Sequence, residues 1–344
     1  MTADELYMRR CLELALKGIN RTAPNPMVGA VLVYQGRIIG EGWHEVYGQA
    51  HAEVNCLNNV RTEDRALIPE SRLYVSLEPC SHFGKTPPCS DRIITEGIRE
   101  VIVGCLDSFV AVSGKGIQKM RNAGITVKTG VLEAECREVN KRFFTRQEKG
   151  RPYIILKWAE TADGFMAAVD GSPIQISGCL QQRLVHQMRY QESAILVGYQ
   201  TALHDNPRLN NRFWLEGRQP LRVVIDFDNS LPENLFLKTD GWPTMIISGQ
   251  KEGVKGSVTW KWISNRENLL QKVVAALSNV NSLIVEGGAK TLQAFINAGL
   301  WDEAHRWVNT EKLSGTGISA PVLKNARMVQ AQSFGIDRLL LFHP

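Results

Sequence analysis

Residues 79–89 read Pro79-Cys80-Ser81-His82-Phe83-Gly84-Lys85-Thr86-Pro87-Pro88-Cys89, and His51-Ala52-Glu53 precedes them in the chain. One histidine and two cysteines provide three ligands for a tetrahedral zinc ion, and the fourth position stays open for water, as in catalytic sites. Zinc makes water a nucleophile at neutral pH, and Glu53 is suited to carry the proton as a general acid/base. The two stretches predict a hydrolytic zinc site formed by His51, Cys80 and Cys89.

The surrounding pattern places these residues at the ends of helices and strands. We expect His51 in the first turn of a helix over 51–60, and Cys80 just after a strand over 73–77. Cys89 is expected to open the next helix. Zinc would thereby join separate elements of an α/β fold around one pocket.

Taken one at a time, these side chains have simpler explanations. A lone cysteine is most often a small buried residue, and a lone histidine at a helix start most often lies on the surface. The joint occurrence of three ligand types with Glu53 and Pro79 favours the metal site. We expect the remaining cysteines, which lack such neighbours, to be ordinary core thiols: Cys11, Cys56, Cys105, Cys136 and Cys179.

The length and the alternation of elements predict two α/β domains. A chain of 344 residues exceeds what one core usually organises. In the first half, strands and helices alternate as in an α/β sandwich, up to a final helix over 132–144. A polar segment with Gly and Pro separates it from a new apolar strand at 153–156. We therefore predict a zinc-dependent domain over 1–147 and a second α/β domain over 152–344.

Charge and hydropathy restrict the partners and the compartment. The net charge of +5 is spread along the chain without a basic run, which favours small anionic ligands over nucleic acid. The stretch 4–13 carries charges throughout, so it lacks the apolar core of a signal peptide. No segment reaches the ~18 apolar residues of a membrane span. We expect a cytoplasmic protein whose cysteines are reduced.

The zinc motif resembles that of the cytidine-deaminase superfamily, H-x-E followed by P-C-x-x-C. Eight residues, instead of two, separate Cys80 from Cys89, and this longer loop is similar to that of the riboflavin-pathway deaminases. The stretches 23–29 (Ala-Pro-Asn-Pro-Met-Val-Gly) and 42–44 (Gly-Trp-His) match the same family. The resemblance implies a three-layer α/β/α sandwich that deaminates a phosphorylated pyrimidine.

The same resemblance implies the substrate contacts of the first domain. Asn25 and His44 would contact the base and the sugar. His82 and Lys85 carry donors at the rim of the zinc site, where they would hold the phosphate of a ribosylated pyrimidine. The stretch 107–116 departs from the family, because the usual prolines are missing while Gly114-Lys115-Gly116 remains.

The second half resembles the riboflavin-pathway reductase, a dihydrofolate-reductase-like α/β domain that binds NADPH. The resemblance is carried by Lys157 to Gly164, Val197-Gly198, Asp205 to Leu209 and Glu286-Gly287-Gly288. A glycine pair between a strand and a helix lets backbone N–H groups approach a phosphate, although such a pair often forms only a tight turn. The residues that the resemblance assigns are Ala159, Gln175, Thr201, Asp205 and Gly288 for NADPH, and Arg189, Leu209, Arg212 and Glu286 for the substrate. Lys157 and Glu286 are our candidates for catalysis, either to polarise the open-chain imine of the sugar or to relay its proton.

Departures from the family are larger in this half. Pro173 and Gln175 replace a serine that contacts the substrate and an aromatic residue that contacts the cofactor, and Phe227 replaces a residue that often carries a hydroxyl. Reduction could therefore be weak. The first hypothesis remains a two-step enzyme that needs Zn²⁺ and NADPH, and we expect it to form a homo-oligomer, a dimer or a tetramer.

Two other hypotheses remain open. The chain could be a deaminase whose C-terminal half is a weakened reductase, or a binding or scaffold module, as Pro173 and Gln175 suggest. It could also be a nucleic-acid deaminase, which uses the same zinc chemistry on a flipped base. The long loop between the cysteines and the lack of a basic, aromatic-rich stretch disfavour the latter.

Overall fold

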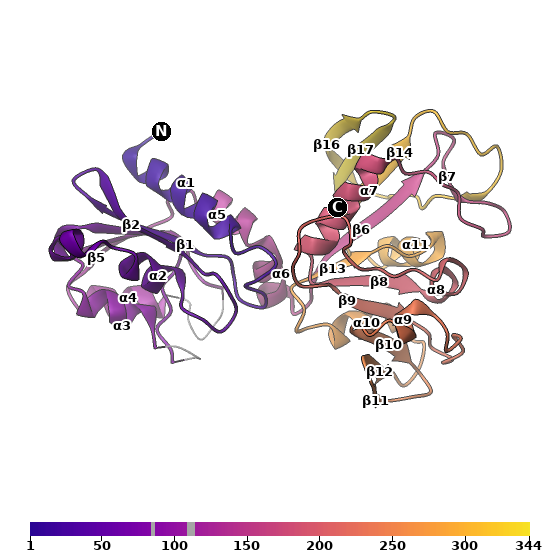
Figure 1. Cartoon of the computed structure of the whole chain (residues 1–344), viewed down its shortest axis with the longest axis horizontal. Coiled ribbons are helices and arrows are strands. Elements are labelled where there is room, and N and C mark those ends of the chain that lie inside the picture. Colours follow the sequence, from indigo (N-terminus) through magenta and orange to yellow (C-terminus); the bar gives the residue numbers. More distant parts are fainter. Residues whose placement is uncertain (84–86, 109–113) are drawn as a thin grey trace. The chain divides into compact units, whose positions relative to one another are not determined.

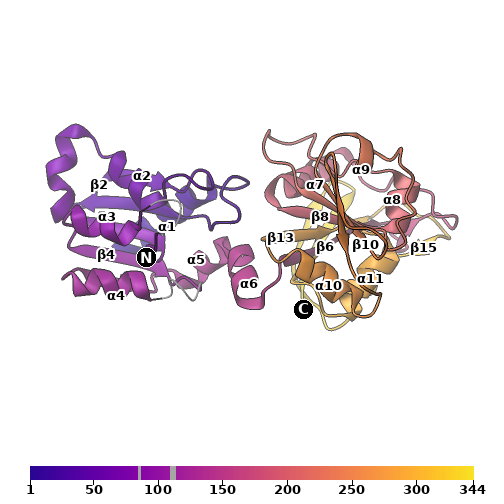
Figure 2. The same cartoon turned by 90° about the horizontal axis from the view of Figure 1, so that it is seen from below.

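The computed structural model describes residues 1–83, 87–108 and 114–344. The chain divides into two compact units, Met1–Lys149 and Gly150–Pro344. Each unit has its own main sheet with helices packed against it, as Figures 1 and 2 show. The predicted fold class, two α/β domains, is confirmed.

In the described part of the first unit, five strands form a mixed sheet in the order β2-β1-β3-β4-β5. β1 pairs antiparallel with β2 and β3, whereas β3, β4 and β5 run parallel. The carboxyl ends of the parallel strands meet at one edge, and the segment with Cys80 follows β3 there. The strands are β1 (Gly29–Tyr34), β2 (Arg37–Trp43), β3 (Arg72–Leu77), β4 (Glu100–Cys105) and β5 (Thr126–Thr129).

Alternate residues of β1 face two different helical layers. Ala30 and Leu32 pack in one core cluster with residues of α2, α3 and α4, whereas Val31 and Val33 pack in another with residues of α1, α5 and α6. A strand buried on both faces requires this arrangement. The first unit is therefore a three-layer α/β/α sandwich. The helices are α1 (Ala3–Leu16), α2 (Ala52–Asn58), the 3₁₀ helix η1 (Thr62–Glu70), α3 (Cys89–Thr95), α4 (Lys115–Asn122), α5 (Glu133–Val139) and α6 (Lys141–Lys149).

The single helix predicted over 132–144 is wrong, because two helices occupy this region. Asn140 separates α5 from α6 with φ −106° and ψ 18°, outside helical geometry. Its side chain forms hydrogen bonds with the backbone of Met27. Asparagine side chains compete in this way with helical backbone hydrogen bonds, and the apolar periodicity did not reveal the interruption.

The second unit contains a sheet of ten strands within its described residues, in the order β11-β12-β10-β9-β8-β13-β6-β14-β17-β16. The strands from β12 to β14 in this order are parallel, and the outer ones pair antiparallel. β7 and β15 form a separate pair. The strands are β6 (Tyr153–Glu160), β7 (Phe165–Ala167), β8 (Ala194–Gly198), β9 (Leu221–Ile225), β10 (Thr244–Ser248), β11 (Gly253–Lys255), β12 (Val258–Trp262), β13 (Ser282–Val285), β14 (Glu303–Asn309), β15 (Ile318–Ser319), β16 (Arg327–Phe334) and β17 (Asp337–His343).

Helices cover both faces of this sheet. Ile195 and Val197 of β8 pack with residues of α8 and α9, whereas Leu196 packs with residues of α10 and α11. The adjacent parallel strands β6, β8 and β13 end at one edge, which is where open α/β sheets usually bind ligands. The helices are α7 (Cys179–Gln191), α8 (Tyr199–Asp205), α9 (Phe236–Thr239), α10 (Leu269–Ala276) and α11 (Ala289–Asn297).

The burial of the cysteines agrees only partly with the prediction from the sequence. Cys11, Cys56, Cys105 and Cys136 are buried as predicted, but Cys179 is exposed. It is the first residue of α7, so the prediction of a core thiol is wrong there.

Within the described residues, no helix has the length and apolar character needed to cross a membrane.

Candidate functional site

The three predicted zinc ligands lie together in the first unit. His51 Nδ1 lies 3.6 Å from Cys80 Sγ and 3.4 Å from Cys89 Sγ. All three ligand atoms lie within 4.8 Å of one another. Because zinc–ligand distances are about 2.0 to 2.3 Å, tetrahedral neighbours lie roughly 3.5 to 3.8 Å apart. The donor set and its spacing therefore fit zinc.

Local structure explains how the ligands meet. His51 is the residue that caps α2 rather than part of its first turn, and its extended backbone leaves its side chain free of a capping hydrogen bond. Cys89 opens α3, as predicted, and its backbone N–H donates to Cys80 Sγ at 3.3 Å. A hydrogen bond from Cys89 and another from His51 lower the pKa of Cys80 to about 4. The thiolate form that zinc binds is therefore favoured at Cys80.

Glu53 lies beside the ligands on the first turn of α2. Only 3% of its surface is exposed, and it lines the same pocket as His51 and Cys80. Burial raises the pKa of Glu53 to about 7, although the charge of His51 acts in the opposite direction. A carboxyl group in this position can take up and release a proton within the pocket.

His51 and Cys80 line a cavity of about 420 Å³, which is called the first-unit pocket below. Asn25 Nδ2 lies 3.2 Å from His44 Nε2, and His44 Nδ1 lies 3.0 Å from the carbonyl of Ala50. The imidazole rings of His44 and His51 are 5.2 Å apart. His82 also lines the pocket, whereas Lys85 lies outside the described residues. Asn25, His44 and His82 thus share one pocket with His51 and Cys80.

Arg146 and Tyr47 also line the first-unit pocket, and the motifs did not identify them. Arg146 is on α6, and its Nη1 donates to the carbonyl of Pro24 at 3.4 Å. Burial lowers the pKa of Arg146. Its place in the pocket depends on how α6 packs against a segment about 120 residues earlier in the chain. No spacing within the sequence could have revealed it.

Asn140 connects α6 to the Asn25 segment. Its Nδ2 donates to the carbonyl of Met27 and its Oδ1 accepts from the N–H of Met27, both at 2.8 Å. Asn140 itself is 3% exposed. Asn140 therefore holds the segment that carries Asn25 into the pocket, through the N–H and the carbonyl of Met27.

We predict that Asn140→Ala lowers the free energy of unfolding of the first unit by about 1 to 3 kcal/mol, because both polar groups of Met27 lose a partner. The Michaelis constant for deamination should rise as well, since Asn25 lies two residues before Met27. Denaturation followed by first-unit probes measures the stability. Asn59→Ala, which removes an exposed hydrogen bond to the carbonyl of Glu41, is the matched control and should have little effect. Equal losses of stability in the two variants would contradict this role of Asn140.

The second unit contains a larger cavity of about 750 Å³, which is called the second-unit pocket below. It lies at the carboxyl ends of β6, β8 and β13. The residues predicted for this half that line it are Lys157, Ala159, Gln175, Arg189, Thr201, Asp205, Arg212, Glu286 and Gly288. Leu209 is different, because its side chain is 3% exposed and packs in the core with Ala202.

A charged cluster forms the inner wall of the second-unit pocket. Arg189 Nη2 donates to Glu286 Oε2 at 2.8 Å, and the two side chains are only 12% and 9% exposed. Burial alone would raise the pKa of Glu286, but the charges of Arg189 and Lys157 lower it to about 2. Burial lowers the pKa of Lys157, whereas Glu286 raises it. Among the described residues, Glu286 Oε1 and Arg189 Nε are buried without a hydrogen-bond partner, as expected of groups that bind a ligand.

The turn before α11 fits a phosphate group. Gly288 N–H donates to Thr201 Oγ1 at 2.8 Å, so the turn is tied to α8. A Cβ atom at Gly287 would lie 2.7 Å from the Cβ of Thr291, which explains the glycine. Backbone N–H groups at the start of such a helix favour anions. The turn, together with the size of the pocket, fits a dinucleotide cofactor.

The residues that depart from the family occupy different places. Pro173 and Gln175 line the second-unit pocket. The side-chain amide of Gln175 donates to the carbonyl of Ser177 at 2.7 Å, and Lys312 Nζ donates to the carbonyl of Gln175 at 2.6 Å. Phe227 instead lies against Arg266, 4.7 Å from its guanidinium.

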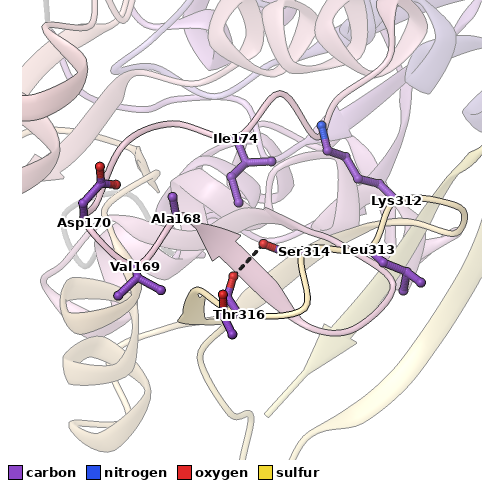
Figure 3. A pocket seen from close by; sticks show the side chains of 8 residues that line it. All are labelled: Ala168, Val169, Asp170, Ile174, Lys312, Leu313, Ser314 and Thr316. Carbon is purple, nitrogen blue, oxygen red and sulfur yellow. Dashed lines mark hydrogen bonds between the residues drawn. The ribbon is translucent and has the colours of Figure 1, made fainter.

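A shallower cavity of about 670 Å³ adjoins the second-unit pocket, between the segments 168–174 and 312–316 (Figure 3). Ser314 Oγ donates to the carbonyl of Thr316 at 2.7 Å and shapes one side of it. Val169, Asp170 and Ile174 line both cavities. The shallower cavity is therefore an outer extension of the second-unit pocket.

Two family models match the chain. Residues 1–105 match the cytidine and deoxycytidylate deaminase zinc-binding region, and residues 152–310 match the RibD C-terminal domain. The riboflavin biosynthesis protein RibD of Aquifex aeolicus is 40% identical over 324 residues, which cover 92% of this chain and 89% of that protein. RibD of Escherichia coli is 36% identical over 320 residues, covering 87% and 86%.

Solved structures agree over nearly the full length. A diaminohydroxyphosphoribosylaminopyrimidine deaminase/5-amino-6-(5-phosphoribosylamino)uracil reductase from Thermotoga maritima is similar with a TM-score of 0.90, at 34% identity and 99% coverage of both chains. RibD of Acinetobacter baumannii gives a TM-score of 0.89 at 29% identity, again with 99% coverage of both chains. The chain therefore belongs to the RibD family of riboflavin biosynthesis proteins, in which a deaminase zinc-binding region is joined to a RibD C-terminal domain.

Proposed function

We propose that this chain catalyses two successive steps of riboflavin biosynthesis. The first unit removes ammonia by hydrolysis from 2,5-diamino-6-(5-phosphoribosylamino)pyrimidin-4(3H)-one, and the product is 5-amino-6-(5-phosphoribosylamino)uracil. The second unit then reduces the ribosyl group to ribityl with NADPH. The observation that carries this proposal is the convergence of His51, Cys80 and Cys89, two of which line one pocket with the buried Glu53.

In the first step, Glu53 moves the protons. Zinc would be held by His51, Cys80 and Cys89 and would supply the Lewis acidity that makes water nucleophilic at neutral pH. Glu53 would transfer the two protons of the attacking water in turn, the first to the ring nitrogen and the second to the leaving amine. Its burial beside the ligands keeps bulk water away from this transfer.

The remaining pocket residues orient the substrate. His44 is held by Asn25 and by the carbonyl of Ala50, so both side chains present fixed polar groups to the base and sugar. His82 and Lys85 are our candidates for the phosphate. Arg146 is a further cation on the pocket wall that suits an anionic group.

We predict that Lys85→Ala raises the Michaelis constant for deamination about tenfold with little change in kcat, because a charge-assisted hydrogen bond to the phosphate is lost. Steady-state ammonia release measures this. Lys119→Ala, which removes an exposed lysine paired with Asp91, is the matched control. An unchanged Michaelis constant in Lys85→Ala would exclude Lys85 from phosphate binding.

In the second step, the protein positions the sugar and supplies a proton. Ala159, Thr201, Asp205 and the Gly288 turn would hold NADPH, which would supply the hydride for C1′ of the open-chain imine. A proton must reach the adjacent nitrogen. Glu286 is ionised at neutral pH and cannot donate one, so Lys157 is the better candidate donor. Arg212 and Arg189 suit the substrate phosphate.

The test of the whole proposal follows both products. Purified enzyme with the diaminopyrimidinone substrate and NADPH should release ammonia and then consume NADPH absorbance. Zinc content measured on the same sample should approach one ion per chain. If the deaminated substrate causes no loss of NADPH absorbance at any concentration, the second unit is instead a binding or scaffold module, as Pro173 and Gln175 would then explain.

We also propose that the chain forms a homo-oligomer, a dimer or a tetramer. β16 is the outermost strand of the second-unit sheet, and nearly all of it is exposed, including 53% of Met328 and 42% of Val329. An unpaired edge strand with apolar side chains is a template for pairing with another chain. Light scattering on the purified protein tests this, and a monomeric mass would contradict it.

A further inference from the structure

His186 lies in the second-unit pocket and has no part in the reaction as described above. It is on α7, three residues before Arg189, and only 4% of its surface is exposed. Its Nδ1 accepts a hydrogen bond of 2.9 Å from the backbone N–H of Arg212. Its ring packs against Phe213 with the centroids 4.7 Å apart. His186 therefore joins α7 to the segment that carries Arg212.

The surroundings of His186 keep its ring neutral. Burial lowers its pKa to about 4, and the charges of Arg189, Arg212 and Lys157 act in the same direction. Glu286, which follows β13, raises the pKa without outweighing these effects. Because Nδ1 accepts the Arg212 N–H, the single proton of the neutral ring is on Nε2.

A neutral N–H group in this wall has a restricted set of partners. The neighbouring cations Lys157, Arg189 and Arg212 attract the phosphate and other anionic groups. A neutral donor is suited to an uncharged oxygen, such as a sugar hydroxyl. With a pKa of about 4, His186 is too weakly basic to carry a proton at neutral pH, so it is not the proton donor of the reduction.

We propose that His186 determines the sugar specificity of the second unit: Nε2–H donates to a hydroxyl of the ribosyl chain, while Nδ1 holds the Arg212 segment. The proposal rests on the reductase step proposed above for its choice of substrate. A buried donor that loses its partner is costly. A site built around such a donor therefore discriminates against a substrate that lacks the hydroxyl.

Two substitutions separate the two nitrogens. In His186→Asn, the amide oxygen can take the place of Nδ1 and accept the Arg212 N–H, but the Nε2 donor is gone. In His186→Gln, the longer amide can keep a donor near Nε2 while the acceptor for Arg212 is lost. The substrates are deaminated ribosyl substrate and its 2′-deoxyribosyl and 3′-deoxyribosyl analogues.

We expect His186→Asn to lower kcat/KM for the ribosyl substrate about 10- to 100-fold. For one of the two deoxyribosyl analogues kcat/KM should stay unchanged, so the preference for the ribosyl substrate over that analogue falls by the same factor. His186→Gln should keep that preference but raise KM for every phosphorylated substrate, because the Arg212 segment is loosened. Unchanged preference in His186→Asn, or identical behaviour of the two variants, would overturn the proposal.

Two further measurements keep this test independent of folding and of turnover. Deaminase activity of the same samples and their thermal unfolding show whether the variants fold. Calorimetric binding of the ribosyl and deoxyribosyl compounds gives the same comparison without reduction. If the wild-type enzyme binds them but never oxidises NADPH, the reductase step fails, while the preference for the hydroxyl still decides the role of His186.

Discussion

Glu53→Gln should lower the rate of deamination by about 10² to 10⁴-fold while zinc remains bound in full. The substitution keeps the size of the side chain but removes the group that exchanges protons. Glu53 is not one of the three ligand residues, so the His51, Cys80 and Cys89 cluster is left intact. The loss should appear in kcat, because proton transfer belongs to the chemical step rather than to binding.

Ammonia release and metal analysis on one preparation measure the two halves of this result. Glu63→Gln, which alters an exposed carboxylate of the same unit, is the matched control and should behave as the wild type. NADPH oxidation with deaminated substrate should be unchanged, since we assign this step to the second-unit pocket. If Glu53→Gln loses zinc along with activity, Glu53 supports the metal site itself. Retained turnover with zinc bound would place the acid/base elsewhere.

The metal site was predictable because its chemistry is encoded in short motifs. Cys80 and Cys89 are nine positions apart, and few arrangements other than a metal site explain them together with His51 and Glu53. Strands such as β3 and β6 were predictable for a related reason, since their buried residues lie in short, mostly apolar runs at 73–77 and 153–156.

Residues that act through distant contacts were not predictable. Asn140 lies 113 positions from Met27, and His186 lies 26 positions from Arg212, so only the packing of separate elements makes them neighbours. Arg146 is similar, because a lone arginine on a helix is usually a solvated residue. Their roles depend on geometry that no local pattern records.

Elements with little buried surface were also missed. β16 is exposed along nearly its whole length, so its sequence lacks the alternation that identifies a half-buried strand. The interruption at Asn140 was hidden by apolar residues on both sides of it. Cys179 was placed in the core because cysteines are usually buried, yet the first residue of α7 faces solvent.

Lys157→Met should lower the rate of NADPH-dependent reduction by about 10² to 10⁴-fold, with deamination unaffected. Methionine fills the space of the lysine stem but donates no proton. The ion pair between Arg189 and Glu286 remains, so the rest of the charged cluster is preserved. In the wild type, Glu286 is not the donor, because its pKa of about 2 keeps it ionised.

The comparison of binding with turnover decides what Lys157 does. If it supplies the proton, the dissociation constant of NADPH should change little while kcat falls, as single-turnover absorbance and calorimetry would show. Lys272→Met, on α10, is the matched control. A large loss of NADPH affinity would make Lys157 a cofactor contact instead. Reduction at the wild-type rate would exclude Lys157 as the proton donor.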